Sequence, residues 1–357
     1  MKQDGIHYNL DEIDSHKSLI NLILGEKSGG KSYQIKHKKA VEYYLKYKKR
    51  FILLRRWKDE VTTEKVEQYF NDVDISKLTN SEYNCISVYR RAIYLSNYDF
   101  ETNKMKRGEK IGYAIALSQE QNYSSISFLD VENIIFEEFM SRTAYIANES
   151  NKLMIFFDTV DRKRGKCRLW LLGNTVSRVC PYLHDWDLSS TINKMLPGDI
   201  RDIYIPDNKN ITLSIEYCKQ TNQKSFAIGE SSSMISGGSW MTSKQPHLSN
   251  SIKSYKPLLR VVFVYYDFKF LATLYENKKN LVWFICPKYT KIKKNTIVIG
   301  QVNESPLYSK NIYNLDYRIS EKIRNLISKT FTESNIFYST DLCGTDFKQS
   351  IDFLIKK

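Results

Sequence analysis

The stretch LILGEKSGGKSYQI, residues 22–35, fits the phosphate-binding pattern G-x-x-x-x-G-K-[ST] and decides the fold of the first part of the chain. An apolar run precedes it and a helix-compatible segment follows it. In that setting, backbone N–H groups at the start of the helix cradle phosphates. The alternative is a glycine-rich strand–helix turn that binds nothing. The predicted nucleotide-binding residues are Gly25, Glu26, Lys27, Ser28, Gly29, Gly30, Lys31, Ser32 and Tyr33.

A nucleotide hydrolase with this loop also needs carboxylates at the end of a buried strand. Lys31 is expected to reach the β- and γ-phosphates of ATP, and the Ser32 hydroxyl to hold Mg²⁺. The run IIFEEF, residues 134–139, places Glu137 and Glu138 at such a strand end. Two buried carboxylates without a cation would be costly. We therefore expect Glu137 near Mg²⁺ and Glu138 orienting the attacking water. The alternatives are exchanged roles, or a strand end that faces solvent.

A basic turn follows in the run DTVDRKRGKCRLWLLGN, residues 158–174, just before another apolar strand. An arginine from such a turn can neutralise charge on the γ-phosphate across a subunit boundary. Asn174, at the end of the strand, suits a polar contact with the γ-phosphate or the attacking water. The alternatives are a solvated or nucleic-acid-binding turn and an ordinary turn asparagine.

Two further arginines, Arg55 and Arg56, close the strand FILLRR, residues 51–56. They are expected at the same edge of the sheet as the nucleotide, where they would pair with Glu138, reach phosphate or cap the sheet. Arg56 is counted among the candidate catalytic residues.

The composition is that of a folded protein with a polyanionic partner. The 357 residues are 42% hydrophobic, and 54 Lys and Arg against 40 Asp and Glu give a formal charge of +14. This charge favours nucleic acid first and an anionic membrane second, with a lysine-rich solubilising surface as the alternative. The six scattered cysteines show no zinc-binding spacing, and no signal peptide or transmembrane segment is evident. We therefore expect a soluble intracellular protein with reduced cysteines.

Short apolar runs alternate with helical patterns, which predicts an α/β fold with a mainly parallel sheet and its ligand at the carboxyl edge. We expect a nucleotide-binding domain over residues 1–206. A polar, Ser/Gly-rich linker or lid is expected over residues 207–256, and a smaller α/β domain over residues 257–357. Within the first domain, residues 85–96 and 110–119 resemble the two strands of a β-hairpin, joined by a charged tip.

Taken together, these motifs resemble the DNA-packaging ATPases of small tailed bacteriophages of the φ29 type. These are ring-forming P-loop ATPases of the additional-strand, catalytic-glutamate class. The resemblance covers about the first 200 residues. It rests on LILGEKSGGKSY, RFILLRRWK, EQYFNDV, GYAIALS, NIIFEEF, DTVDRKRGKCRLWLLGNTVS and CPYL.

The resemblance assigns roles to individual residues. It implies that Gly25 to Ser32 form the Walker A loop and that Glu137 and Glu138 occupy the Asp-Glu pair of Walker B, with Glu in place of the usual Asp. It implies that Arg162 is the arginine finger that acts on a neighbouring subunit, with Arg164 and Arg168 as substitutes. Asn174 resembles the polar sensor.

The resemblance also implies a C-terminal domain with an RNase H-like nuclease fold that has lost its catalytic carboxylates. Asp267 lies near the place of a first metal-binding Asp, and no second or third carboxylate is evident at strand ends. A vestigial binding domain is therefore favoured over an active nuclease.

The implied function is a homomeric ring, pentameric in this family, that hydrolyses ATP to move double-stranded DNA through the phage portal into the procapsid. It would work in the host cytoplasm, transiently attached to the portal vertex, and some relatives use a packaging RNA. A translocase grips phosphates, so basic loop tips are expected to face the DNA. The candidate residues are Lys104, Lys106, Arg107 and Lys110.

Two other readings remain open from the residues. A small-molecule kinase would use the same loop without an arginine from a neighbour. A structural protein would bind ATP only to set its conformation or assembly, and it would keep its function when Glu138 is replaced by Gln.

Overall fold

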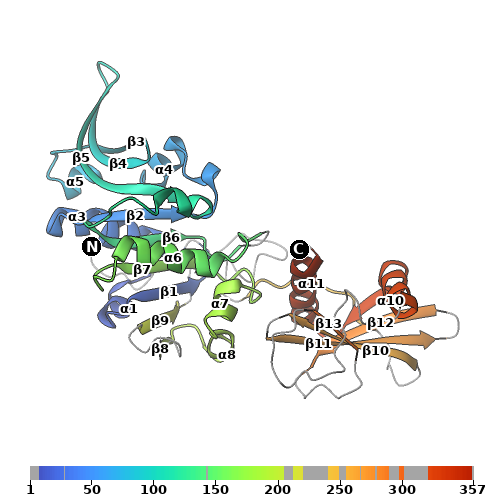
Figure 1. Ribbon diagram of the computed structural model, residues 1–357. Coiled ribbons are helices and arrows are strands. Elements are labelled where there is room, and N and C mark those ends of the chain that lie inside the picture. Colours follow the sequence, from blue (N-terminus) through green and yellow to red (C-terminus); the bar gives the residue numbers. More distant parts are fainter. Residues whose placement is uncertain are drawn as a thin grey trace. The chain divides into compact units, whose positions relative to one another are not determined.

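The computed structural model describes residues 8–27, 29–141, 144–204, 212–219, 240–248, 255–265, 267–277, 280–288, 297–300 and 321–355. The chain divides into two compact units, Met1–Trp240 and Met241–Lys357. Figure 1 shows both units, and each is described by itself.

The first unit is built on a nine-stranded sheet with the order β3-β4-β5-β2-β6-β7-β1-β9-β8. Neighbouring strands from β5 to β9 in this order are parallel, and the pairs at the two edges are antiparallel. The strands are β1 (Ile20–Gly25), β2 (Arg50–Arg55), β3 (Cys85–Tyr89), β4 (Ala92–Asp99), β5 (Lys104–Ala116), β6 (Val131–Glu137), β7 (Arg168–Asn174), β8 (Ile200–Tyr204) and β9 (Thr212–Tyr217). The expected mainly parallel α/β sheet is confirmed.

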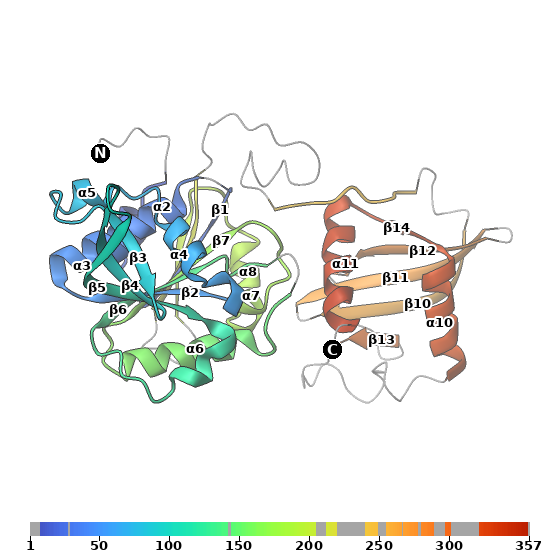
Figure 2. The same ribbon diagram turned by 90° about the horizontal axis from the view of Figure 1, so that it is seen from above.

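Helices cover both faces of this sheet (Figure 2). On one face lie α1 (Asp11–Ser15), α2 (Lys31–Ile35), a π-helical turn (Lys36–Val41), α3 (Glu42–Tyr47), α4 (Thr63–Tyr69) and α5 (Ile75–Leu78). On the other lie α6 (Glu149–Asp161), α7 (Pro181–Asp185) and α8 (Ser189–Ile192). Short 3₁₀ turns occupy Lys58–Glu60 and Leu117–Tyr123. The central strands read as continuous apolar runs because both of their faces are buried; in β1, Leu22 and Ile23 enter opposite cores.

The expected hairpin differs from the structure in one respect. Residues 85–96 were predicted to form one strand, but they form β3, a tight turn and the first part of β4. Arg90 and Arg91 both have positive φ, 46° and 66°, as in the two-residue turns that match strand twist. No Gly or Asn marks this turn in the sequence. β4 and β5 then extend as a ribbon beyond the sheet (Figure 1), so the four basic candidates lie along β5 rather than in a loop.

The predicted boundary after residue 206 also differs from the structure. β9 falls inside the predicted linker, yet it pairs in parallel with β1 and is buried. Its sequence TLSIEY is short and half polar, but Leu213 and Ile215 complete one of the two cores. The rest of the predicted linker lies largely outside the described residues. Ser28 of the phosphate loop also lies outside them.

The second unit contains a five-stranded sheet with the order β13-β10-β11-β12-β14. Its strands are β10 (Lys256–Tyr265), β11 (Phe268–Asn277), β12 (Asn280–Pro287), β13 (Ile297–Gly300) and β14 (Asn335–Tyr338). Helices α10 (Glu321–Glu333) and α11 (Asp341–Ile355) pack on one face through Ile327 and Phe347. The expected smaller α/β domain is therefore present. Asp267 is an exposed residue in the turn between β10 and β11.

Two observations concern the chain as a whole. All six cysteines are free thiols, as expected, and Cys167, Cys180, Cys218 and Cys343 are buried. Among the described residues, no helix is both long and apolar enough to cross a membrane.

Candidate nucleotide site

The phosphate loop leaves β1 at the carboxyl edge of the sheet and enters α2. Gly25 ends β1 against β9, where an added Cβ would lie 2.9 Å from the Cβ of Cys218. Gly30 precedes α2 with a φ of 94°, a left-handed conformation that favours glycine. The N–H of Tyr8 donates to the Gly29 carbonyl at 3.0 Å, so the segment before α1 also contacts the loop. Local backbone geometry therefore explains both glycines of the motif.

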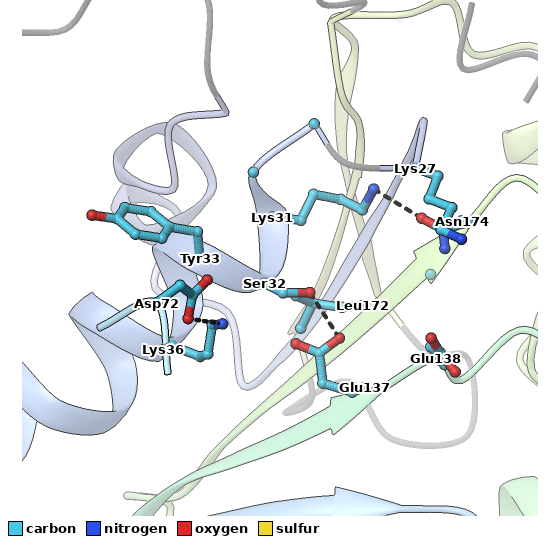
Figure 3. A pocket seen from close by; sticks show the side chains of 13 residues that line it. Lys27, Lys31, Ser32, Tyr33, Lys36, Asp72, Glu137, Glu138, Leu172 and Asn174 are labelled. Atoms are coloured by element: carbon cyan, nitrogen blue, oxygen red, sulfur yellow. Dashed lines mark hydrogen bonds and ion pairs between the residues drawn. The ribbon is translucent and has the colours of Figure 1, made fainter. Parts of the chain in front are cut away.

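Lys31 and Ser32 turn their polar ends into a pocket of about 360 Å³. The Lys31 ammonium donates to the Glu26 carbonyl at 2.5 Å and to Asn174 Oδ1 at 3.2 Å. Burial is the main cause that lowers the pKa of Lys31, although nearby carboxylates oppose it. The Ser32 hydroxyl donates to Glu137 Oε2 at 3.0 Å (Figure 3). Residues from α2, β6, β7 and the loop after β1 therefore meet at one point.

The two glutamates at the end of β6 have opposite surroundings. Glu137 is buried, and burial raises the pKa of its carboxyl group. Its Oε1 accepts from the Tyr69 hydroxyl at 2.6 Å, while Oε2 accepts from Ser32. Glu138 lies just past the strand with a φ of 55°, and its side chain is 61% exposed. Glu138 Oε2 accepts from Arg55 Nη2 at 3.0 Å, which is one of the three alternatives offered for the arginines of this strand.

Asn174 and Glu138 also line a second, adjoining pocket of about 350 Å³, together with Lys27. The two pockets share these three residues, so they form one continuous site at the ends of β6 and β7. Tyr33, Lys36 and Asp72 line the far side of the first pocket (Figure 3). Lys36 forms an ion pair with Asp72 and lies 4.6 Å from the ring centroid of Tyr69.

Arg56 lines the second pocket and is bonded there to other protein groups. It is 5% exposed, and its Nε and Nη2 donate to both carboxylate oxygens of Glu149 at 2.8 and 2.9 Å. Its remaining bonds go to the carbonyls of Glu138, at 3.2 Å, and Phe139, at 2.6 Å. The guanidinium is thus committed to protein partners, and it contacts the main chain of the Glu138 loop. These contacts are those of a residue that positions this loop, and the catalytic role of Arg56 stays a prediction.

The arginines of the basic turn are separated by the structure. Arg164 donates to the carbonyls of Phe128, Leu129, Val131, Val160 and Asp161. Arg168 pairs with Asp14 and lies 4.4 Å from the ring centroid of Trp170. Arg162 is exposed and donates to the Ile126 carbonyl at 3.1 Å. Arg164 and Arg168 therefore stabilise the fold. Arg162 is the arginine of this turn that is exposed to solvent.

Arg162 also lies far from the nucleotide pocket of its own chain. It follows α6 and precedes β7, whereas the pocket lies at the other end of β7. A strand of seven residues spans roughly 20 Å. Arg162 therefore does not reach its own site in this structure.

Sequence reasoning missed three residues that shape the site: Tyr69, Glu149 and Asp72. Tyr69 comes from α4 and Glu149 from α6, and each contact depends on how a helix packs on the sheet. The run EQYFNDV, residues 67–73, is among the motifs singled out above, but its pattern does not indicate which side chain meets Glu137. Among the described residues, no group of three or more His, Cys, Asp or Glu is placed to hold a metal ion.

Comparison with known proteins gives a consistent result. Residues 2–341 match the profile of the family described as podovirus DNA encapsidation protein (Gp16). The chain is 33% identical over 207 residues to the DNA packaging proteins of Bacillus phages PZA and phi29. This match spans 57% of this chain and 57% of the length of each relative.

A solved structure described as the bacteriophage Phi-29 viral genome packaging motor assembly matches the fold. Its TM-score is 0.58 at 21% identity, and the match covers 98% of this chain and 99% of that chain.

Proposed function

The chain belongs to the podovirus DNA encapsidation protein family, and from this premise we propose that it is an ATP hydrolase that drives double-stranded DNA into a phage procapsid. One observation carries the proposal: Lys31 and Ser32 of α2, Glu137 of β6 and Asn174 of β7 come from three separate elements and converge on one pocket, with Glu138 at its rim. The relatives that match over 57% of their length are DNA packaging proteins, which supports the same activity here.

The residues of the pocket divide the work of phosphoryl transfer. The loop N–H groups and Lys31 bind the phosphates, and Asn174, already bonded to Lys31, faces the terminal phosphate. Glu138, which is exposed to the second pocket, orients and deprotonates the attacking water. Arg162 is too far from its own pocket, so it serves the site of a neighbouring copy in a ring.

The pocket also fits Mg²⁺, because the Ser32 hydroxyl and the Glu137 carboxylate offer neighbouring oxygen atoms, the ligands this ion prefers. Held by Ser32 and Glu137, Mg²⁺ would supply positive charge that neutralises the charge developing on the phosphates. Glu137 is one carbon longer than the usual Asp, and the Tyr69 hydroxyl fixes its carboxylate. The hydrogen bond from Tyr69 thus holds the longer side chain of Glu137 in place.

The proposed partners follow from charge and family. Double-stranded DNA suits the formal charge of +14 and the basic ribbon that carries Lys104, Lys106, Arg107 and Lys110. We propose a homomeric ring, pentameric as in the family it resembles, that docks on the portal of the procapsid in the host cytoplasm. A packaging RNA would be a further polyanionic partner.

Glu138→Gln tests the assignment of the catalytic base. The variant keeps the size of the side chain but cannot take a proton, so we expect nucleotide affinity within about twofold of wild type. Hydrolysis should fall on the order of 10²-fold or more. Binding of a fluorescent ADP analogue and steady-state phosphate release measure the two effects. Glu132→Gln, on the same strand, is the matched control.

A Glu138→Gln variant that hydrolyses ATP at the wild-type rate would contradict the proposal. Wild-type protein that binds ATP without hydrolysing it in the presence of DNA would favour the structural ATP-binding protein instead.

A further inference from the structure

Two successive arginines hold the loop that carries Glu138. Arg55 donates to its carboxylate, and Arg56 donates to its carbonyl and to that of Phe139. Glu138 has a positive φ, which a residue with a side chain rarely adopts unless its surroundings impose it. Arg56 is therefore part of what imposes the conformation of the catalytic loop.

The guanidinium of Arg56 is itself held by the first residue of α6. Glu149 accepts from Arg56 through both carboxylate oxygens, and its side chain is fully buried. It also accepts from the Tyr182 hydroxyl and the Ile146 N–H, each at 2.7 Å. A buried pair with this many bonds adds little to stability, but its geometry is sharply defined. The Glu138 loop is thereby tied to the start of α6.

The other end of α6 is tied to the basic turn. The Asp161 carboxylate accepts the N–H groups of Gly165, Lys166 and Cys167 at 2.8 to 3.0 Å. Arg162 follows directly as the C-cap, with a φ of 49°. Along the helix, Leu153 and Phe156 lie in the main core. A helix of 13 residues is roughly 20 Å long. It therefore spans the distance between the Glu138 loop and Arg162 as one packed body.

We propose that α6, through the buried Arg56–Glu149 pair, couples the conformation of a subunit's Glu138 loop to the position of the Arg162 that it offers to its neighbour. Each subunit would then transmit the state of its own site across the ring. Glu149 and Arg56 are positioning residues in this scheme, because they act through the main chain of the Glu138 loop. The inference rests on the proposed ring with an arginine supplied in trans.

Mixed rings can test this coupling, because they separate the subunit that hydrolyses from the subunit that supplies the arginine. Subunits with Arg162→Ala keep their own catalytic loop, and subunits with Glu138→Gln keep the arginine but do not hydrolyse. In a mixture of the two, the Glu138→Gln subunit is the donor of the arginine. ATP hydrolysis by the mixture above that of either variant alone, here called rescue, shows that the donor supplies Arg162 to the other subunit. Glu149→Gln is then added to this donor only.

The coupling predicts that Glu149→Gln in the donor lowers the rate of ATP hydrolysis by the mixed rings at least fivefold. This loss cannot come from the donor's own catalysis, because Glu138→Gln has already removed it. Asp158→Asn, an exposed acid on the same helix, is the matched control and should leave the rescue within twofold. Donor folding is checked by Tm and by binding of fluorescent ADP. The double replacement Arg56→Met with Glu149→Met removes both buried charges together, so it avoids an unpaired charge and should give the same loss.

Three outcomes decide the matter. Loss of rescue with a folded, nucleotide-binding donor supports the coupling. Rescue that stays within twofold for both Glu149→Gln and the double replacement overturns it, while the trans arginine stands. Absence of any rescue in the parent mixture overturns the trans arginine, and the coupling with it.

Discussion

At the scale of single residues, Glu137 shows how a departure from the usual Asp is accommodated. Its carboxylate is buried between two hydroxyl donors, Ser32 on one oxygen and Tyr69 on the other. Tyr69 is itself partly buried, and desolvation raises the pKa of its hydroxyl well above the usual value, so it stays a donor. The position of Glu137 therefore depends on α4 as well as on the phosphate loop.

Tyr69→Phe removes one of these donors. We expect the unfolding free energy to fall by about 1–3 kcal/mol, because a buried carboxylate oxygen loses its partner. The affinity for the ADP analogue should fall more in Mg²⁺ than in EDTA, since Glu137 is the proposed metal-side carboxylate. Urea unfolding and fluorescence titration measure the two effects, with the half-exposed Tyr47→Phe as control. Equal losses of affinity in Mg²⁺ and EDTA would argue against a link between Tyr69 and the metal.

A second buried carboxylate makes stability depend on pH. Glu216, on β9, accepts from the Tyr8 hydroxyl at 2.7 Å, and burial raises the pKa of Glu216 from 4.5 to about 7. Between these values the folded state binds more protons than the unfolded state. The contribution of Glu216 to stability is therefore present at pH 4 and is lost as pH rises through 7.

Glu216→Gln removes this loss, because an amide carries no charge at any of these pH values. We expect a higher Tm than wild type at pH 8, by an amount equivalent to at most roughly 3 kcal/mol. The difference should shrink towards zero near pH 4. Thermal unfolding across pH 4–8 measures it, with the exposed Glu101→Gln as control. A Tm difference that does not change with pH would contradict the assignment.

Much of the site, but not all of it, follows from the sequence at this scale. Gly30, Lys31, Ser32 and the two glutamates are fixed by local spacing, because the loop and α2 come soon after β1 and the glutamates lie at the end of β6. Arg56 and Arg164 are different, because their partners are carboxylates and carbonyls from distant segments. The sequence pattern contains no sign of those partners, so the role of each arginine depends on tertiary packing.

At the scale of elements, the strand–helix alternation predicted the parallel sheet, because buried strands and amphipathic helices have different periods. It missed the turn at Arg90–Arg91 and the inclusion of β9. Both depend on pairing between strands: the turn uses no typical turn residue, and β9 gains its place by packing beside β1. Such pairing between distant strands cannot be predicted from local composition alone.

The β4–β5 ribbon carries the four basic residues that we propose contact DNA. In the antiparallel register Lys104 lies opposite Asp99 and Lys106 opposite Asn97, so both lysines share one face. Arg107 lies 4.5 Å from the ring centroid of Tyr89. These side chains are exposed, and the ribbon projects from the body of the first unit (Figure 1).

Replacing Lys104, Lys106, Arg107 and Lys110 with Ala should weaken binding to double-stranded DNA of any sequence. The slope of log affinity against log salt should become shallower by about 0.9 for each side chain that contacts a phosphate. Fluorescence anisotropy at several salt concentrations measures this slope. A control with Lys46, Lys65, Lys77 and Lys194 replaced removes the same charge from exposed sites outside the ribbon. Equal changes in both variants would show that only net charge matters.

At the scale of the whole molecule, the described residues form a phosphate pocket at one end of β7, and Arg162 lies towards the other end. In the proposed ring, Arg162 serves a second copy because it lies far from the pocket of its own chain. The kinase reading requires no such copy, since its catalytic arginines converge from the same chain. If the protein is a ring ATPase, hydrolysis therefore depends on self-association. If it is a small-molecule kinase, hydrolysis does not depend on self-association.

The most direct test is the steady-state rate of ATP hydrolysis per subunit, measured against protein concentration, with and without double-stranded DNA. A ring motor predicts a rate that rises with concentration and with DNA in the wild type. In Arg162→Ala the rate should collapse by about 10³-fold or more, with nucleotide binding retained. A rate that is indifferent to concentration, to DNA and to Arg162 would contradict the account and favour the kinase.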